Sequence, residues 1–398
     1  MLSNKFTKKL HKFSFRKIIL LGIVFPGILL LATRSGVLIN KDKNRVSDIS
    51  IRELSDNLQN KDFIFINVHT PYEGEIQKTD LFIEYDFLIA SKEKLPKDKE
   101  ARIILYCKTG SMSKKAAQTL KGLGYKNVSH LSGGMEEWKK AGYQTLDLSK
   151  LVNKIASQDM VTLPFSWKNT AKKLVETGVI DYQKYGELMS LTDEQRLILT
   201  KGSDSLIKID NQNSRFILNT LWALGLAQRS LVYEVGPMGT TYKDTKGNFA
   251  STGGWTLSKG NATNYLGKLN LINLTQDEQQ RVYEIASNIN RPCCGNHTAF
   301  PDCNHGMAAL AAIELLVSEG KSEGEIYKYI LSLNSMWFPD TYLYLATYFE
   351  RQGIKWDAVD AKTALGNDYS SAQGAARIYK EVGDLPYQSN QGGGACQA

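Results

Sequence analysis

Short apolar runs followed by glycine-containing turns organise residues 46–146. The runs at 63–69, 103–106 and 126–131 have the apolar density of buried strands. The second run breaks into a small polar loop and restarts with helix-spaced apolar positions, and the third is followed by Gly133-Gly134 and another helical pattern. The pattern therefore predicts strands that each end in a turn leading into a helix.

The rest of the chain has a different pattern, with apolar positions at helical spacing between polar ends. We expect a mainly α-helical domain over 150–385 and a flexible tail over 386–398, which is rich in glycine. Ser322 and Glu325 have the spacing of a capping box, and the Gly, Thr and Asn-rich stretch at 236–267 predicts a long ordered loop. The predicted helices cover 167–177, 192–199, 214–224, 276–289, 306–318, 323–333 and 340–351.

An uninterrupted apolar run at residues 18–32 follows a basic stretch without acidic residues. This pattern is typical of an export signal, and its length lies between that of a signal-peptide core and that of a spanning helix of about 20 residues. Because no Ala-x-Ala motif follows, we predict that residues 1–40 hold an uncleaved membrane anchor with the body of the protein outside the cytoplasm. Cleavage of the signal would instead give a secreted or periplasmic protein.

Positive charge is concentrated at the same end of the chain. The 398 residues carry a net charge of +8, of which residues 1–45 contribute +9, so residues 46–398 are close to neutral at −1. A near-neutral body lacks the basic surface that binds nucleic-acid phosphates. We therefore expect no nucleic-acid partner.

Cys107 is placed where the run at 103–106 ends and a helix begins. The backbone N–H groups of such a loop and the positive end of the helix dipole together bind anions and favour a thiolate. A buried structural cysteine is the alternative interpretation. We predict that Cys107 is a nucleophilic sulfur in an anion cradle formed by Lys108, Thr109, Gly110, Ser111 and Met112.

Three features together resemble the rhodanese-like domain. They are the Cys-x-x-Gly-x-x-Ser loop at 107–113, the Gly-Gly-x-x-x-Trp signature at 133–138 and the order of strands over 46–146. The resemblance implies an α/β fold in which helices flank a parallel sheet. It also implies a sulfurtransferase that carries sulfane sulfur as a persulfide on Cys107, with Lys108 as a charge partner, between a donor and a thiol acceptor that the sequence does not identify.

The loop departs from the pattern of many active members, which have arginine one and five residues after the cysteine. Lys108 and Met112 occupy these places, and the usual Asp-x-Arg of the earlier strand end is Asn67-Val68-His69. Because the bidentate guanidinium groups are lost, we expect weak turnover of thiosulfate, although a persulfide can still form. Related phosphatases require arginine six residues after the cysteine, where this chain has Ser113, so the loop does not favour a phosphatase.

A second group of chemically reactive residues lies between positions 293 and 305. Cys303 and His305 directly precede an apolar helix, whose N-terminus favours a thiolate. Three interpretations stay open: a site for Cu or Zn, a thiol centre that accepts sulfur or electrons, and a disulfide, which export would permit. The candidate ligands are Cys293, Cys294, His297, Cys303 and His305.

These predictions combine into one hypothesis and one alternative. The hypothesis is a membrane-anchored, extracytoplasmic protein in which Cys107 transfers sulfane sulfur, with Cys293, Cys294 and Cys303 as a candidate acceptor. The alternative is a protein that binds a thiophilic metal ion at the Cys/His cluster and keeps the rhodanese-like domain as a scaffold.

Overall fold

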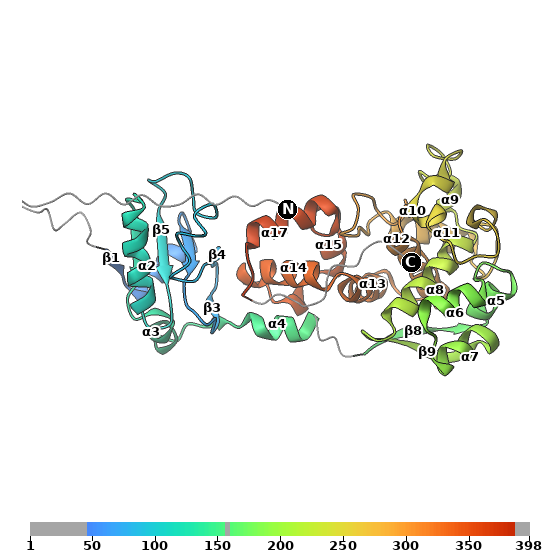
Figure 1. The fold of residues 1–398 in the computed structure, drawn as a ribbon, viewed down its shortest axis with the longest axis horizontal. Helices are drawn as coiled ribbons and strands as arrows, with labels where there is room; N and C mark the ends of the chain where they lie inside the picture. The colour runs from blue at the N-terminus through green and yellow to red at the C-terminus, as the bar shows by residue number, and fades with distance from the viewer. Residues whose placement is uncertain (1–45, 156–159, 387–398) are drawn as a thin grey trace, which may run out of the picture. The chain divides into compact units, whose positions relative to one another are not determined.

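The computed structural model describes residues 46–155 and 160–386 (Figure 1). Its N-terminal part contains a five-stranded sheet in the order β1-β6-β5-β2-β4, and every pairing in it is parallel. A short antiparallel pair, β3 (Glu75–Ile76) with β7 (Thr145–Leu146), lies outside this sheet. The sheet strands are β1 (Ser47–Ile49), β2 (Ile64–Asn67), β4 (Leu81–Phe82), β5 (Ile103–Tyr106) and β6 (Val128–Leu131).

Helices cover both faces of this sheet. Successive strand residues point to opposite sides, and apolar side chains on each side pack against helices. Leu105 and Cys107 pack with residues of α2 (Ser111–Gly122) in one apolar cluster. Tyr106 packs on the other face with residues of α1 (Ile51–Gln59) and α3 (Gly134–Lys140). The predicted α/β architecture, a parallel sheet with flanking helices, is confirmed.

The region after the sheet is mainly helical, as predicted, and most of its predicted helices are present within two to four residues of the expected bounds. Its core contains α8 and α12, which are buried almost all round, as expected of helices that are apolar on every face. A Cβ on Gly225 would come within 2.1 Å of the Met307 carbonyl oxygen, so glycine lets these two helices approach closely. The longer helices are α5 (Thr170–Glu176), α6 (Tyr182–Met189), α7 (Asp193–Lys201), α8 (Ser214–Ala227), α11 (Gln276–Ala286), α12 (Asn304–Ser318), α13 (Glu323–Trp337), α14 (Pro339–Arg351) and α17 (Ala372–Val382).

Two strands in this region were not predicted. β8 (Val161–Lys168) pairs with β9 (Ser203–Ile209) in an antiparallel ladder beside α7 (Figure 1). Leu163, Phe165 and Trp167 are buried at alternate positions, which is the strand period. The predicted start of a helix at residue 167 was therefore wrong. The chain is an extended strand through Lys168, and the helix begins at Thr170.

The stretch at 236–267 is ordered, as predicted, and short helical turns divide it. Trp255 is 2 % exposed and its indole N–H donates to the Val179 carbonyl. Phe249 and Tyr242 pack against Phe300, whose ring stacks on that of Tyr242. Aromatic side chains therefore fix this segment to the helical core.

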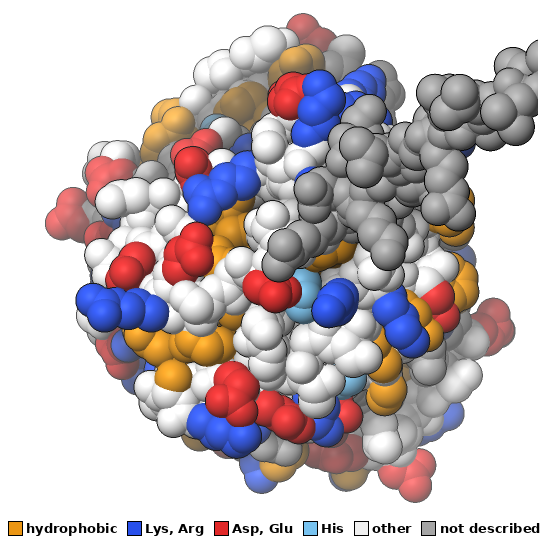
Figure 2. All heavy atoms as spheres, turned by 90° about the vertical axis from the view of Figure 1, so that its left-hand side faces the viewer, with side chains coloured by type: hydrophobic (Ala, Val, Ile, Leu, Met, Phe, Trp, Pro, Cys, Tyr) orange, Lys and Arg blue, Asp and Glu red, His pale blue; other side chains and the backbone are white. Residues whose placement is uncertain are grey.

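Within 46–155 and 160–386, none of the helices is both long enough and apolar enough to cross a membrane. The predicted anchor at 18–32 and residues 387–398 of the predicted tail lie outside the described residues. Anchoring and an extracytoplasmic location stay predictions. On the face shown in Figure 2, basic and acidic side chains are interspersed rather than separated by sign.

Candidate functional site

The Cys107 sulfur lies at the N-terminus of α2, directly after β5. Its side chain is 1 % exposed, and the backbone N–H groups of Gly110 and Ser113 donate to Sγ at 3.1 and 3.4 Å. Gly110 has φ +91°, a conformation that glycine adopts without strain, and a Cβ there would lie 3.0 Å from the Gly133 nitrogen. Two N–H donors and the helix dipole therefore converge on this sulfur.

The predicted cradle is only partly the observed one. Gly110 supplies one of the two donors, and the other comes from Ser113, one residue beyond the predicted range. Thr109 and Ser111 are exposed, whereas Met112 is half-buried against the apolar cluster on the α2 face. The methionine at this position therefore adds apolar packing and no charge.

A chain of polar side chains leads away from the sulfur. Ser113 Oγ is 3.7 Å from Cys107 Sγ, donates to the Gly110 carbonyl and lies 3.2 Å from His130 Nδ1. The other ring nitrogen of His130 is 2.7 Å from Asp48 Oδ1, and Asp48 is exposed. Burial lowers the pKa of His130, although Asp48 opposes that shift, so the ring is neutral near pH 7. The arrangement can carry a proton from the buried thiol towards the surface.

Lys108 brings an ion pair to the loop rather than a lone cation. Its Nζ is 2.7 Å from Glu73 Oε2, and this contact raises the pKa of Lys108 and lowers that of Glu73. The other Glu73 oxygen is 3.7 Å from His69 Nε2, and burial lowers the pKa of His69. Glu73 was not recognised from the sequence, because no local pattern relates it to a lysine 35 residues later.

Asn67 stands where the usual pattern has aspartate, and its side chain forms two structural hydrogen bonds. Its side-chain amide donates to the Gly74 carbonyl, and its side-chain oxygen accepts from the His69 N–H, both at 3.0 Å. An amide can donate and accept at the same time, which a carboxylate cannot. Asn67 therefore holds the segment that carries Glu73 beside the Cys107 loop.

The glycine pair before α3 explains part of the sequence signature. The N–H groups of Met135 and Glu136 donate to the carbonyls of Cys107 and Lys108 at 2.9 and 3.0 Å. A Cβ on Gly134 would lie 2.3 Å from the Cys107 oxygen and 2.5 Å from the Lys108 oxygen. Only glycine lets the start of α3 satisfy the carbonyls of the reactive loop.

The cysteines of the second group converge in the structure. The Sγ atoms of Cys293, Cys294 and Cys303 all lie within 4.8 Å of one another, and those of Cys293 and Cys303 are 3.5 Å apart. Cys303 caps α12, where its sulfur accepts from the Gly306 N–H at 3.4 Å. Cys303 is buried, whereas Cys293 and Cys294 are half-buried.

Arg291 is the residue of this cluster that sequence analysis missed. It is 0 % exposed, and its Nη2 lies 3.1 Å from Cys294 Sγ, 3.6 Å from Cys303 Sγ and 2.8 Å from Asp302 Oδ1. Its position two residues before a vicinal cysteine pair was the available signal.

The proton distribution in the cluster is uneven. Hydrogen bonds from Cys293 and Cys294, helped by Arg291 and opposed by burial, hold the pKa of Cys303 well below its usual value. Contact with Cys293 lowers the pKa of Cys294, but contact with Cys303 and burial outweigh it and raise that pKa to about 11. Negative charge therefore concentrates on Cys303.

The two predicted histidine ligands do not join the sulfurs. The group of possible metal-ligating atoms found among the described residues contains the three sulfurs and neither histidine. The His305 ring packs on Phe338, with centroids 4.4 Å apart, and burial lowers the pKa of His297. A soft metal ion at this place would thus be held by thiolates alone.

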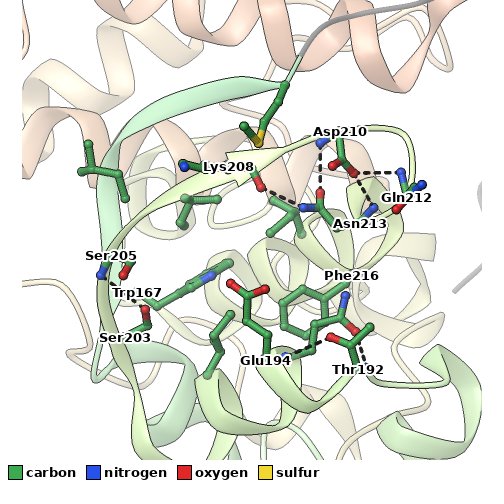
Figure 3. Close-up of a pocket in the computed structure, with 16 residues that line it drawn as sticks. Trp167, Thr192, Glu194, Ser203, Ser205, Lys208, Asp210, Gln212, Asn213 and Phe216 are labelled. Carbon is green, nitrogen blue, oxygen red and sulfur yellow. Dashed lines mark hydrogen bonds between the residues drawn. The ribbon is translucent and has the colours of Figure 1, made fainter.

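A cavity of about 450 Å³ lies between the paired strands β8 and β9 and helices α7 and α8 (Figure 3). Asp210 accepts from the N–H groups of Gln212 and Asn213, and the Asn213 amide donates to the Lys208 carbonyl. These polar side chains of the cavity wall therefore form hydrogen bonds that stabilise the turn after β9. We assign no chemical function to the cavity.

Comparison with known proteins locates the family signal in the N-terminal part. The family model of the rhodanese-like domain matches residues 50–141. Over 99 residues the chain is 38 % identical to the probable adenylyltransferase/sulfurtransferase MoeZ of Mycobacterium tuberculosis, covering 24 % of this chain and 25 % of that protein. It is 29 % identical over 94 residues to the tRNA uridine(34) hydroxylase of Erwinia tasmaniensis, covering 22 % and 27 %.

Among solved structures, a rhodanese-like domain protein from Staphylococcus aureus shares 24 % identity, covering 26 % of this chain and 97 % of that one, with a TM-score of 0.23. The chain spans about a quarter of the length of the curated relatives it matches. The family match, together with the parallel sheet and the cysteine loop, identifies residues 50–141 as a rhodanese-like domain. The resemblance inferred from the sequence is confirmed.

Proposed function

We propose that this protein transfers sulfane sulfur through a persulfide on Cys107. The observation that carries the proposal is the sulfur itself, held at the N-terminus of α2 with the N–H groups of Gly110 and Ser113 donating to it. These donors favour an anionic sulfur there, which is what both the attacking thiolate and the resulting persulfide require. The MoeZ relative, whose name includes a sulfurtransferase activity, supports the same assignment.

The reaction has two displacements. The Cys107 thiolate attacks the sulfane sulfur of a donor, and the bond between that sulfur and the rest of the donor breaks, so the donor leaves with the electron pair. A thiolate of the acceptor then attacks the outer sulfur of the Cys107 persulfide, which returns Cys107 to a thiolate. Ser113 and His130 offer the thiol proton a route outward before the first step.

The charges around the loop do not favour a donor whose sulfane sulfur is attached to a compact oxyanion, as it is in thiosulfate. Lys108 is paired with Glu73, and Met112 contributes packing only. A doubly charged donor such as thiosulfate would find no unpaired guanidinium on residues 108–112, which include no arginine. We therefore propose an organic persulfide, in which a thiol carries the sulfane sulfur, as the donor class.

Mass spectrometry of the reduced full chain treated with glutathione persulfide tests this proposal. We expect the peptide containing Cys107 to gain the mass of one sulfur atom, and Cys107→Ser to abolish that gain because serine oxygen cannot form a persulfide. The exposed α2 position Gln118→Ser serves as the matched control and should load normally. Absence of sulfur on Cys107 in a folded, reduced chain would refute the assignment.

Binding of a thiophilic metal ion is the second candidate function, and the three convergent sulfurs favour it. The buried Arg291 guanidinium counts against it, because it places a positive charge within 3.1 to 3.6 Å of two of those sulfurs. Metal analysis of protein purified anaerobically without chelators tests this candidate. One equivalent of Cu or Zn, lost on Cys294→Ser, would support it.

A further inference from the structure

We propose that Cys293 and Cys303 form a dithiol centre that reduces the sulfane sulfur of a persulfide to hydrosulfide and closes to a disulfide. The structure brings their sulfurs to 3.5 Å, in direct contact across ten residues of sequence. Two thiols at this distance need only a small movement to form a bond. This function is separate from the transfer step at Cys107.

The surroundings divide the roles between the two cysteines. Cys303 is 6 % exposed and receives the Gly306 N–H at 3.4 Å and the Arg291 guanidinium at 3.6 Å, so it is the natural seat of a thiolate. Cys293 is half-buried, and a substrate can reach it from solvent more readily than Cys303. We assign Cys293 as the residue that meets the persulfide and Cys303 as the residue that resolves it.

The first step moves one sulfur atom. The Cys293 sulfur attacks the outer sulfur of the persulfide R–S–SH and loses its thiol proton. The sulfur–sulfur bond of the substrate breaks, and R–S⁻ leaves with the electron pair and takes up that proton. Cys293 then carries a persulfide, and Cys303 remains a thiolate.

The second step is the reduction. The Cys303 thiolate attacks Cys293 Sγ, the bond from that atom to the outer sulfur breaks, and HS⁻ leaves. The balance is R–S–SH plus two thiols giving R–SH, hydrogen sulfide and one disulfide: the sulfane sulfur gains two electrons and the two cysteines lose them. Each further cycle needs a dithiol reductant to reopen the Cys293–Cys303 disulfide.

Arg291 favours this chemistry over metal binding. Two of its nitrogens, Nε and Nη1, have no hydrogen-bond partner within the described residues, although the side chain is 0 % exposed. A buried guanidinium with unused donors is complementary to an anion, such as a thiolate or a departing hydrosulfide, and unfavourable beside a metal cation. A Cβ on Gly306 would lie 2.8 Å from Nη2, so glycine at the start of α12 makes room for the guanidinium.

A single-turnover experiment tests the dithiol centre independently of Cys107. The reduced, metal-free full chain and its Cys107→Ser variant are mixed anaerobically with glutathione persulfide, and released sulfide and disulfides are measured. We expect both proteins to release sulfide and to contain a Cys293–Cys303 disulfide in matching amounts. Cys303→Ser should lower sulfide release by at least about tenfold and leave a trapped persulfide on Cys293.

The disulfide is mapped in the unaltered chain, so the result does not depend on whether a variant folds. A disulfide that includes Cys294, or no disulfide in spite of sulfide release, would overturn the assignment. Tightly bound metal that survives anaerobic purification and blocks the reaction would overturn it too. Loading of Cys107 without sulfide release would leave the proposed function intact and remove only this inference. Sulfide release without loading of Cys107 would support this inference and refute the proposed function of Cys107.

Discussion

Glu314 is a carboxylic acid on α12 in the core of the helical region. It is 0 % exposed, and neither carboxylate oxygen has a hydrogen-bond partner among the described residues. Burial raises the pKa of Glu314 to about 8, and the nearby Ser230 opposes this only in part. The residue is therefore neutral in the folded protein at pH 7 and charged in the unfolded chain.

This difference makes stability depend on pH. Because the folded-state pKa lies above the unfolded value, the contribution of Glu314 to stability is complete below about pH 4.5 and is lost as the pH rises to about 8. We expect Glu314→Gln to raise the free energy of unfolding at pH 8 by a few kcal/mol, on the order of the linkage term, and to change it little at pH 4.5. Urea unfolding at both pH values measures this. The exposed Glu284→Gln is the control, and an equal gain at both pH values would contradict the explanation.

The contact between the Cys107 loop and α3 depends on Gly134, at the N-terminus of α3. Gly134 has φ +59° and leaves no room for a side chain beside the loop carbonyls, whereas Gly142, which follows the end of α3, has φ +89° and open space where a Cβ would lie. Substitutions at Gly134 and Gly142 therefore distinguish two effects of replacing a glycine: backbone strain at positive φ, which both share, and steric overlap, which only Gly134 has.

We expect Gly142→Ala to cost about 1 kcal/mol of unfolding free energy from strain alone. Gly134→Ala should cost about 2 to 4 kcal/mol, since overpacking adds to the same strain. Gly134→Ala should also reduce persulfide loading, because the overlap pushes the Cys107 carbonyl. Denaturant unfolding and the mass-spectrometric loading assay measure the two effects. Similar results for both variants would show that the steric overlap is relieved without disturbing the loop.

A buried ion pair joins the rhodanese-like domain to the helical region. The Arg351 guanidinium on α14 donates to both oxygens of Glu75, at 2.8 and 3.1 Å, and also to the Val382 carbonyl. Glu75 is 0 % exposed and lies two residues after Glu73, which pairs with Lys108 of the reactive loop. The segment beside Cys107 is thus held from two sides.

Removing one partner of this pair should lower the stability of the whole molecule. We expect Arg351→Met to lower the free energy of unfolding by about 3 to 5 kcal/mol, since it strands a buried carboxylate. Glu75→Gln combined with Arg351→Met should lose less than Arg351→Met alone, and urea unfolding of the double-mutant cycle measures the difference. The exposed Arg377–Glu381 pair is the control, where Arg377→Met should cost under about 1 kcal/mol. Additive effects at Glu75 and Arg351 would contradict the coupling.

Much of this protein was determined by sequence features that act within a few residues. The strand–loop–helix around Cys107 and the capping box at Ser322 depend on local backbone geometry and local hydrogen bonds. For that reason the rhodanese-like domain with its parallel sheet, and the helical region after it, could be predicted from the sequence.

Only the tertiary structure decided contacts between distant positions. The pairing of β8 with β9 overrode the helical spacing around residue 167, and the histidines predicted as ligands face other surroundings than the three sulfurs. Arg291 became a central residue because folding buried it against the sulfurs, and Glu75 and Arg351 met across 276 residues. Local periodicity carries no information about such partners, since they are chosen by the packing of whole elements.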